Sequence, residues 1–520
     1  MNRTHRQGLI ILGIGLVLAL LLALPGATVT TKYLNDLYIF LDGAHRLWTG
    51  QIPNVDFHSS LGPLAFVIPA AGYGLTGSMG AAMPVGMALV VLALSLAAWR
   101  AIAARMRPAL GLLLALHLLL VAAVPMNPGE SIADLSFAMF YNRIGWAALG
   151  LLLVMYLPPA RPQPLADAVV AAGLTVAMLA LKVSYGLVGL VFLGLLLTDR
   201  AQRGWAALAL VFCGLALALT ALLWDGAAGH IADLRLASEV SGELPDAGSL
   251  AQIALNNLPG FVTLLFLFAL VLWQTRSLRD LAFVGFAALA GLLIIEQNFQ
   301  TFDILTLGVA AAVGAERFCR QGGRLAPGMP LLLASLLLPL TAQHGTALGL
   351  HVALAGTGQG EPSALPRFAE VRLVRLWREG PWTGFRRYEE SLADGAEALA
   401  RLPDLEKVLV LDFVNPFSAG LGLNPPQGDS PWHHWGRTVD EVHYLPDSIF
   451  DDVQVVLDPK APIEGWTARG LRDVHAQVLA ERFVLVEETD FWRVYVAKEF
   501  LRSAQDRQIR VARHSISAQP

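Results

Sequence analysis

Long apolar segments alternate with short polar ones through the first two thirds of the chain, a pattern typical of membrane-spanning helices. A helix needs roughly 20 mostly apolar residues to cross the hydrocarbon core of a bilayer. Eleven segments are suitable, at 9–24, 80–99, 109–126, 138–157, 164–181, 183–198, 205–224, 259–275, 280–295, 303–318 and 327–345. Another apolar segment, 62–75, is short and interrupted by prolines and glycines, so we interpret it as a helix lying at the membrane interface.

After residue 345 the pattern becomes that of a soluble α/β domain. Helical periodicity occupies 385–402 and 466–482, short apolar runs at 407–413 and 453–459 are typical of buried strands, and 483–498 is typical of a β-hairpin. We therefore predict a mainly α-helical polytopic membrane protein with a C-terminal α/β domain. Its expected parts are a membrane domain of about 11 transmembrane helices at 1–345, a linker with an amphipathic helix at 346–384, the α/β domain at 385–500 and a disordered tail at 501–520.

The composition agrees with a membrane protein, because 55% of the residues are hydrophobic and only 15% are charged. The net charge of −4 gives no indication of a nucleic-acid partner. Neither Cys213, inside an apolar segment, nor Cys319, beside basic residues, is placed to form a structural disulfide. The first apolar segment is long for a signal peptide, although small residues follow it, and we expect it to remain as a transmembrane helix.

The distribution of basic residues orients the predicted helices. With eleven spans and a cytoplasmic N-terminus, the inner side receives most of the arginines, as the positive-inside rule requires. These inner residues are Arg3, Arg6, Arg100, Arg105, Arg107, Arg161, Arg200, Arg203, Arg276, Arg279, Arg317, Arg320 and Arg324. A twelfth span at 62–75 would move three of them outward, so the bias favours eleven spans and an extracytoplasmic C-terminal domain.

Acidic residues gather on the predicted outer side. They lie in or beside the expected outer loops at 29–79, 127–137, 225–258 and 296–303. Acids contribute little to orientation, so their position suggests chemistry at the outer face. In the first loop, helical spacing of apolar residues from 35 to 49 predicts an amphipathic helix at the membrane surface. Gly50 and Pro53 end this helix, and Asp56 and His58 follow.

Asp36 lies where the first span has ended and the amphipathic helix begins. An acid in the first turn can simply complement the helix dipole, which contributes about 0.3–1 kcal/mol. It can also serve as a catalytic carboxylate at the boundary of water and lipid.

The stretch ND…DGAHRLWTGQIPNVDF…GPL, from Asn35 to Leu64, resembles the bacterial GT-C glycosyltransferase superfamily. It has an early acid, a G–x–x–P–x–x–D–F motif and GPL before an interfacial helix, and the layout of 1–345 is similar to polyprenyl-phosphate-sugar-dependent mannosyl- or aminoarabinose-transferases. The resemblance implies a bacterial inner-membrane enzyme with a periplasmic C-terminal domain. It also implies that Asp36 is the general base for the acceptor or helps to hold a divalent cation such as Mg or Mn. The acidic doublet of the family is absent, because Asn35 and Leu37 flank Asp36.

Three further positions are candidates in the outer loops and span ends. The resemblance implies a second functional acid in the 127–137 loop, for which Asp134 is preferred and Glu130 is the other candidate; the alternative is an ordinary solvated loop acid. Arg143 lies inside a span, where a charge faces a partner or cavity by default, so it either binds phosphate or extends to the interface. The resemblance implies that Lys182 contacts the lipid phosphate, with Tyr185 one turn away, and the alternative is a topological anchor.

The short outer loop at 296–303 is dense in amide side chains, which either bind sugar hydroxyls or are ordinary loop polarity. Its candidate residues are Gln297, Asn298 and Gln300, and Asp56 and His58 are the candidates for substrate binding in the first loop. The loop at 225–258 is long enough to form a lid.

These features favour an inverting glycosyltransferase that moves a sugar from a polyprenyl-phosphate donor to a hydroxyl of a lipid or glycan acceptor. We expect the enzyme to be surrounded by membrane lipids. Two alternatives stay open. A lipid-linked glycan transporter would show polar residues near the middle of the membrane, whereas these spans are apolar in their middles. A non-catalytic scaffold would use its soluble domain to bind envelope glycans.

Overall fold

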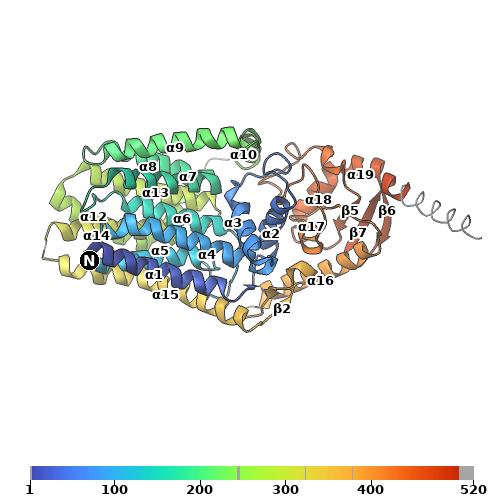
Figure 1. The fold of residues 1–520 in the computed structure, drawn as a ribbon, viewed down its shortest axis with the longest axis horizontal. Helices are drawn as coiled ribbons and strands as arrows, with labels where there is room; N and C mark the ends of the chain where they lie inside the picture. Colours follow the sequence, from blue (N-terminus) through green and yellow to red (C-terminus); the bar gives the residue numbers. More distant parts are fainter. Residues whose placement is uncertain (1–2, 243–245, 323, 378, 503–520) are drawn as a thin grey trace, which may run out of the picture. The chain divides into compact units, whose positions relative to one another are not determined.

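The computed structural model describes residues 3–242, 246–322, 324–377 and 379–502 (Figure 1). The chain is mainly helical and divides into two compact units. The helical unit comprises Met1–Lys32, Leu61–Trp224 and Glu243–Gly360, and the mixed unit comprises Tyr33–Ser60, Asp225–Gly242 and Glu361–Pro520. Two segments that the sequence places in outer loops of the membrane domain, 33–60 and 225–242, therefore pack with the C-terminal part of the chain.

The helical unit consists of helices joined by short connections. Its elements are α1 (Arg3–Ala23), β1 (Thr28–Thr30), α3 (Leu64–Thr76), α4 (Met79–Ala98) with a π-helical turn η1 (Trp99–Ala103), α5 (Pro108–Ala123), α6 (Phe140–Val154), α7 (Pro164–Leu181), α8 (Val183–Leu196), α9 (Arg203–Leu223), α11 (Ala247–Asn256), α12 (Leu258–Thr275), α13 (Leu278–Gln297), α14 (Leu305–Arg320), η2 (Ala326–Gly328) and α15 (Met329–Gly356).

Seven stretches of helix in the described residues are long and apolar enough to cross a membrane. They are Arg3–Ala23, Met79–Ala103, Pro164–Leu181, Arg203–Leu223, Leu258–Thr275, Leu278–Gln297 and Ala326–Gly356. Each overlaps a segment expected from the sequence to be a span, but the last continues to Gly356, past the expected end at residue 345 and into the expected linker. The other four expected spans lie on shorter helices, α5, α6, α8 and α14, of 14 to 16 residues. Length and composition therefore support a membrane protein without fixing the number of crossings at eleven.

The segment expected to be an interfacial helix forms α3, which packs closely on α4. A Cβ atom at Gly72 would lie 2.0 Å from the carbonyl oxygen of Ala82, and one at Gly86 would lie 2.4 Å from that of Ile68. Because real Cβ atoms do not approach backbone oxygens so closely, glycine is required at both positions. The glycines that interrupt this apolar segment thus allow two helix backbones to touch.

The mixed unit contains both helices and strands. Its elements are α2 (Leu34–Trp48), α10 (Ala227–Ser241), β2 (Glu361–Pro362), η3 (Pro366–Phe368), β3 (Val371–Leu373), α16 (Glu379–Ala400), β4 (Val408–Val410), α17 (Pro416–Leu421), η4 (Asp447–Phe450), β5 (Val455–Pro459), α18 (Gly465–Val474), α19 (Ala476–Arg482), β6 (Phe483–Glu488) and β7 (Trp492–Ala497). The long loop expected at 225–258 thus contains α10 and α11. The expected disordered tail lies almost entirely outside the described residues.

A four-stranded sheet with the order β4-β5-β7-β6 forms the centre of the C-terminal part. β4 and β5 are parallel, and β7 pairs antiparallel with both β5 and β6. The strands expected at 407–413 and 453–459 and the hairpin expected at 483–498 are therefore confirmed. The helix expected at 385–402 is the second part of α16, whereas the one expected at 466–482 is divided at His475 into α18 and α19.

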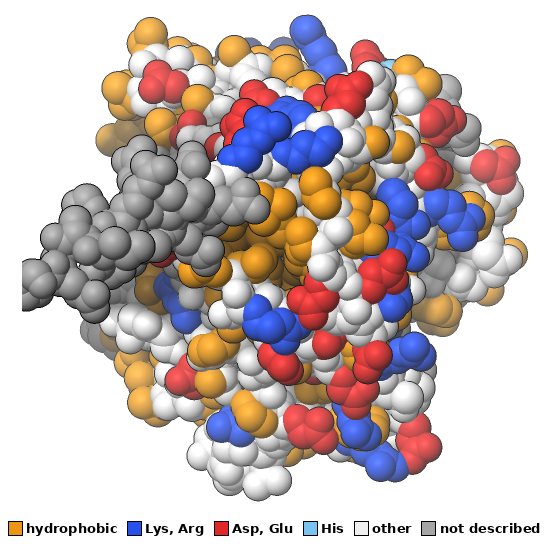
Figure 2. All heavy atoms as spheres, turned by 90° about the vertical axis from the view of Figure 1, so that its right-hand side faces the viewer, with side chains coloured by type: hydrophobic (Ala, Val, Ile, Leu, Met, Phe, Trp, Pro, Cys, Tyr) orange, Lys and Arg blue, Asp and Glu red, His pale blue; other side chains and the backbone are white. Residues whose placement is uncertain are grey.

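β6 is an edge strand with an exposed apolar surface. Val484, Leu485 and Val486 are each 40–44% exposed, and the pairing with β7 shifts register between Leu485 and Glu487. Figure 2 views the molecule from the side on which Figure 1 shows β6, and hydrophobic side chains gather there among charged ones. A bulge of this kind twists an edge strand and interrupts the ladder that another strand would need for pairing.

Candidate functional site

Lys182 lies at a break between two apolar helices of the helical unit. α7 ends at Leu181 and α8 begins at Val183, and Lys182 itself is extended, with φ −154° and ψ 116°. Its backbone N–H still donates to the carbonyl of Met178 at 2.9 Å, which closes the last turn of α7. The single extended residue directs a cation into the unit, where the Lys182 side chain is buried with 8% of the residue exposed.

A compact polar cluster surrounds the Lys182 ammonium. Nζ donates to Oδ1 of Asn298, lies 3.5 Å from Oδ1 of Asn142 and lies 5.6 Å from the centre of the Tyr141 ring. The Asn298 amide nitrogen donates to the Tyr185 hydroxyl at 3.0 Å. We call these five residues the Lys182 cluster. It joins α6, α8 and the end of α13, and it brings together three of the residues singled out from the sequence, Lys182, Tyr185 and Asn298.

Arg143 adds a second buried cation beside this cluster, because it follows Asn142 on α6. It is fully buried, and Nη1 donates to Oδ1 of Asn127 at 2.8 Å and to the carbonyl of Ala138 at 2.9 Å. The Asn127 amide in turn lies 3.4 Å from Glu130, which is paired with Lys32 at 2.9 Å. Arg143 therefore does not extend to an interface through an exposed side chain.

The remaining amides of the 296–303 loop lie less deeply. Gln297 is exposed and accepts a hydrogen bond from the Ser184 hydroxyl at 3.3 Å. Gln300 is half-buried, and its Oε1 is a buried acceptor without a partner among the described residues. Asp303 anchors the loop, because it accepts the Gly129 N–H at 2.7 Å. Asn298 is thus the residue of this loop that the fold inserts into the Lys182 cluster.

The two acids expected to be catalytic occupy different units. Asp134 is buried in the loop before α6, and its Oδ2 accepts the Ser131 N–H at 3.3 Å. Asp36 is half-buried in the first turn of α2, where it also complements the helix dipole. Their catalytic roles remain predictions.

In this structure Asp56 stabilises a turn. Its Oδ2 accepts the Ile52 N–H at 2.7 Å, and its carbonyl accepts the Gly428 N–H at 2.7 Å. Asn54 has a positive φ of 60°, which Asn tolerates better than most residues, and Phe57 is fully buried. The G–x–x–P–x–x–D–F motif therefore has a clear structural role, independent of any substrate.

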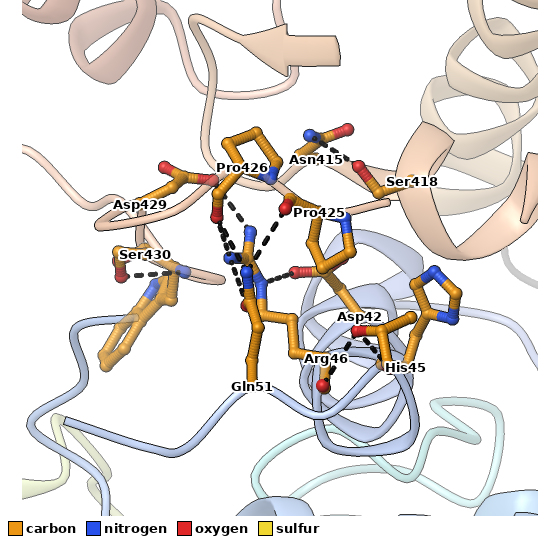
Figure 3. Close-up of polar contacts among 12 residues, drawn as sticks. Asp42, His45, Arg46, Gln51, Asn415, Ser418, Pro425, Pro426, Asp429 and Ser430 are labelled. Carbon is orange, nitrogen blue, oxygen red and sulfur yellow. Dashed lines mark hydrogen bonds and ion pairs between the residues drawn. The ribbon is translucent and has the colours of Figure 1, made fainter. Parts of the chain in front are cut away.

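Arg46, on the polar face of α2, forms the centre of a buried ionic network (Figure 3). Its Nε donates to Asp42 at 2.7 Å and its Nη2 donates to Asp429 at 2.8 Å, and all three side chains are at most 1% exposed. Gln51 accepts from Arg46 Nη1 at 3.3 Å and donates to the carbonyls of Pro425 and Pro426. The polar face of α2 is therefore covered by the 423–430 segment of the same unit.

Burial and charge act differently on the two carboxyl groups of this network. Burial raises the pKa of Asp42 to about 6, against the opposing effect of Arg46. Burial also acts to raise the pKa of Asp429, but the hydrogen bond from His433 and the charge of Arg46 together hold it below its ordinary value. His433 Nε2 lies 3.0 Å from Asp429 Oδ1. Asp429 is therefore the carboxylate whose ionised form the network favours.

His58 and Asp233 form an oriented dyad in the mixed unit. His58 Nδ1 lies 2.8 Å from Asp233 Oδ1, while Asp233 Oδ2 accepts from the Asn54 amide at 2.6 Å and the Ser59 N–H at 2.9 Å. The His58 side chain is 38% exposed and lines a small pocket with Ser430 and other residues of the unit. A carboxylate that fixes one imidazole nitrogen leaves the other available for proton transfer.

We expect Asp233 to control the protonation of His58. The hydrogen bond to Asp233 raises the pKa of His58 above 6.5, with Asp429 contributing in the same direction. Asp233→Asn is therefore expected to lower this pKa, because it removes the charge and the accepting carboxylate that favour the protonated imidazole. The measurement is the pH dependence of diethyl pyrocarbonate modification of His58, followed by peptide mass spectrometry on the full-length protein.

The exposed residue Asp225 provides the matched control, because Asp225→Asn removes an acid from the same segment without touching His58. Since the folded pKa is raised, protonated His58 stabilises the unit below pH 6.5, and this contribution is lost as the pH rises through the folded value. Equal modification midpoints in wild type and Asp233→Asn would show that the dyad does not set the pKa.

Several members of these clusters were not selected from the sequence. Asn142 precedes Arg143 at the start of a span, and Asp233 lies in a loop rich in acids, so neither stands out locally. A polar residue adjacent to an intramembrane charge was the available signal for Asn142. Among the described residues, no three His, Cys, Asp or Glu side chains are close enough to hold a metal ion.

A scan against models of known protein families gives no match to this chain, and a search of curated proteins finds none that is similar.

Proposed function

We propose that the protein is a membrane glycosyltransferase that uses a polyprenyl-phosphate sugar as donor and an acceptor hydroxyl as nucleophile. The observation that carries the proposal is the Lys182 cluster, in which a buried ammonium is surrounded by amide and phenol side chains at a break between two apolar helices. A cation in such a place is costly and marks a functional site by default. A lipid phosphate supplies the negative charge that this environment favours.

Arg143 supports the same assignment, since it supplies a second buried positive charge next to Asn142. Its hydrogen bonds within 3.0 Å go to uncharged oxygens, those of Asn127 and Ala138. Guanidinium groups bind phosphate oxygens in a bidentate manner, whereas ammonium groups act as point charges. The pair thus offers complementary donors for the phosphate that leaves when the sugar is transferred.

The proposed reaction is a single displacement with inversion. The acceptor oxygen forms a bond to the anomeric carbon, while the bond from that carbon to the phosphate oxygen breaks and its electron pair remains on the polyprenyl phosphate. The acceptor proton goes to a carboxylate, for which the sequence resemblance suggests Asp36 and, within the helical unit, Asp134. Lys182 and Arg143 stabilise the charge that develops on the leaving phosphate. Removal of the acceptor proton by a positioned carboxylate contributes roughly 100- to 10,000-fold in rate.

The proposed topology has eleven crossings with the Lys182 cluster toward the outer side. It is supported by the way polar residues group within the helical unit. Residues expected on the inner side, such as Arg107 and Arg320, share the carboxylate of Glu316. Residues expected on the outer side pair with each other, as Lys32 does with Glu130.

The direct test is sugar transfer by the purified full-length protein. A panel of labelled polyprenyl-phosphate sugars is offered with membrane lipids and envelope glycans as acceptors, and wild type is compared with Asp36→Asn. We expect transfer by the wild type and a loss of at least 100-fold in the variant, with donor binding retained.

Two other outcomes of the transfer assay would change the proposal. Full activity of Asp36→Asn would keep the enzyme and remove Asp36 as its base, so that Asp134 and His58 become the next variants. A protein that binds polyprenyl phosphate but releases none of it from any labelled donor would contradict glycosyl transfer. That result would favour a transporter or a scaffold.

A further inference from the structure

A different end of the helical unit contains two adjoining pockets that no step of the proposed transfer uses. The first has a volume of about 430 Å³ and is lined by Thr4, His5, Leu96, Trp99, Arg100, Ala104, Arg161 and Gln163. The second, of about 390 Å³, is lined by Arg3, Thr4, Gln7, Ala103, Ala104, Arg105, Met106, Arg107, Ala160, Glu316 and Arg320. They share Thr4 and Ala104, and each volume lies in the range of small-molecule sites.

The pocket walls carry a large excess of positive charge. Six arginines face two carboxylates, because Asp167 pairs with Arg100 and Arg105 at 2.7 Å and Glu316 pairs with Arg107 at 3.1 Å and with Arg320 at 3.2 Å. The other two arginines, Arg3 and Arg161, are exposed. Neither makes an ion pair with any residue that the structure describes. The shared carboxylates hold four arginines in fixed positions and leave their charge only half neutralised.

The two pockets combine a buried polar group that lacks a hydrogen-bond partner with exposed apolar side chains. Gln7, which lines the second pocket, is 2% exposed, and its Nε2 is a buried donor without a hydrogen-bond partner among the described residues. Leu96, which lines the first pocket, is 61% exposed, and Leu9 on the neighbouring helix α1 is 44% exposed. Trp99 contacts His5 edge to face at 5.3 Å between ring centres. A ligand here needs both an anionic head and an apolar chain.

We propose that these basic pockets form a binding site for the phosphate headgroup of an anionic phospholipid. The arginines and the Gln7 amide donate to the phosphate oxygens, and an acyl chain lies against Leu96 and Leu9. Exposed leucines beside the arginines favour a lipid over a free anion, which would gain nothing from them. Two adjoining pockets also suit a lipid with two phosphates, such as a cardiolipin. The proposal is independent of glycosyl transfer.

Native mass spectrometry of the full-length protein in detergent tests the proposal, with phosphatidylglycerol, cardiolipin or phosphatidylcholine added. We expect the two anionic lipids to stay bound under conditions that remove phosphatidylcholine. The double variant Arg3→Gln/Arg161→Gln changes only exposed, unpaired arginines, so its fold should be intact. It should lower the bound anionic lipid roughly 10- to 30-fold, because each arginine contributes a separate attraction to the phosphate.

Arg276→Gln is the matched control, since Arg276 is exposed at the end of α12 and lines neither pocket. Equal retention of phosphatidylcholine, or equal losses in the double variant and the control, would overturn the proposal. A third arm adds millimolar inorganic phosphate. Retention of the lipid in its presence supports a lipid site, whereas displacement would assign the pockets to a free phosphate ion and overturn the lipid as ligand.

Discussion

Replacement of Lys182 by methionine is expected to lower sugar transfer at least 100-fold while the protein remains folded. Methionine keeps the length and apolar stem of lysine, but it removes the charge that faces Asn142 and Asn298. Loss of one preorganised donor to a developing oxyanion typically costs 100- to 1,000-fold in rate. The measurement is the initial rate of transfer with the best donor of the panel, together with binding of polyprenyl phosphate by native mass spectrometry.

Two controls separate a role in phosphate binding from a role in folding. Lys32→Met removes a partly exposed lysine of the same unit that pairs with Glu130, and it should leave transfer within a few-fold of wild type. Lys182→Arg keeps the charge and should retain more activity than Lys182→Met. If Lys182→Met instead lowers the thermal stability and leaves the rate per folded molecule unchanged, Lys182 is a topological anchor.

Replacement of Arg46 by methionine is expected to destabilise the mixed unit by about 3–5 kcal/mol, the usual cost of removing one partner from a buried ionic network. Asp42 and Asp429 are at most 1% exposed and would be left without their cation. The loss would also free the 423–430 segment from α2. The measurement is pulse proteolysis of the full-length protein across a urea series, with cleavage sites in the mixed unit identified by mass spectrometry.

Arg386→Met is the matched control, because its ion pair with Glu390 at 3.3 Å has both side chains 51% exposed. Exposed pairs contribute about 0–1 kcal/mol, so this variant should unfold close to wild type. The double variant Asp42→Asn/Arg46→Met should recover part of the stability, since it removes one of the two stranded charges. An Arg46→Met protein as stable as Arg386→Met would show that the network is not needed to hold α2.

Hydrophobic periodicity was sufficient for much of the secondary structure. The seven long apolar helices and the strands β4, β5, β6 and β7 all lie where the local pattern predicts them. These features depend on residues close together in the chain, whose spacing directly reflects burial on one face or on all faces. The split between α18 and α19 at His475 was missed, because the apolar pattern continues across it.

The polar face of α2 shows the limit of that approach. Its periodicity identifies the face that carries Asp42, His45 and Arg46, and it predicts a helix whose polar face meets water at the membrane surface. In the structure the face is buried, with Arg46 on Asp429 and His45 Nε2 at 2.7 Å from the carbonyl of Leu423. Hydrophobic periodicity reveals which residues share a face, but the segment that covers this face lies 378 to 383 residues away in the sequence.

The sequence by itself therefore determined the class of the molecule, a largely helical chain with apolar segments and an α/β part, and it selected Lys182, Tyr185 and Asn298 as separate candidates. Only the tertiary structure decided that these three meet, that His58 is oriented by Asp233, and that Asp56 stabilises a turn. The physical reason is that hydrophobic patterning is a local property, whereas the partner of a buried polar group is decided by which distant helices pack together.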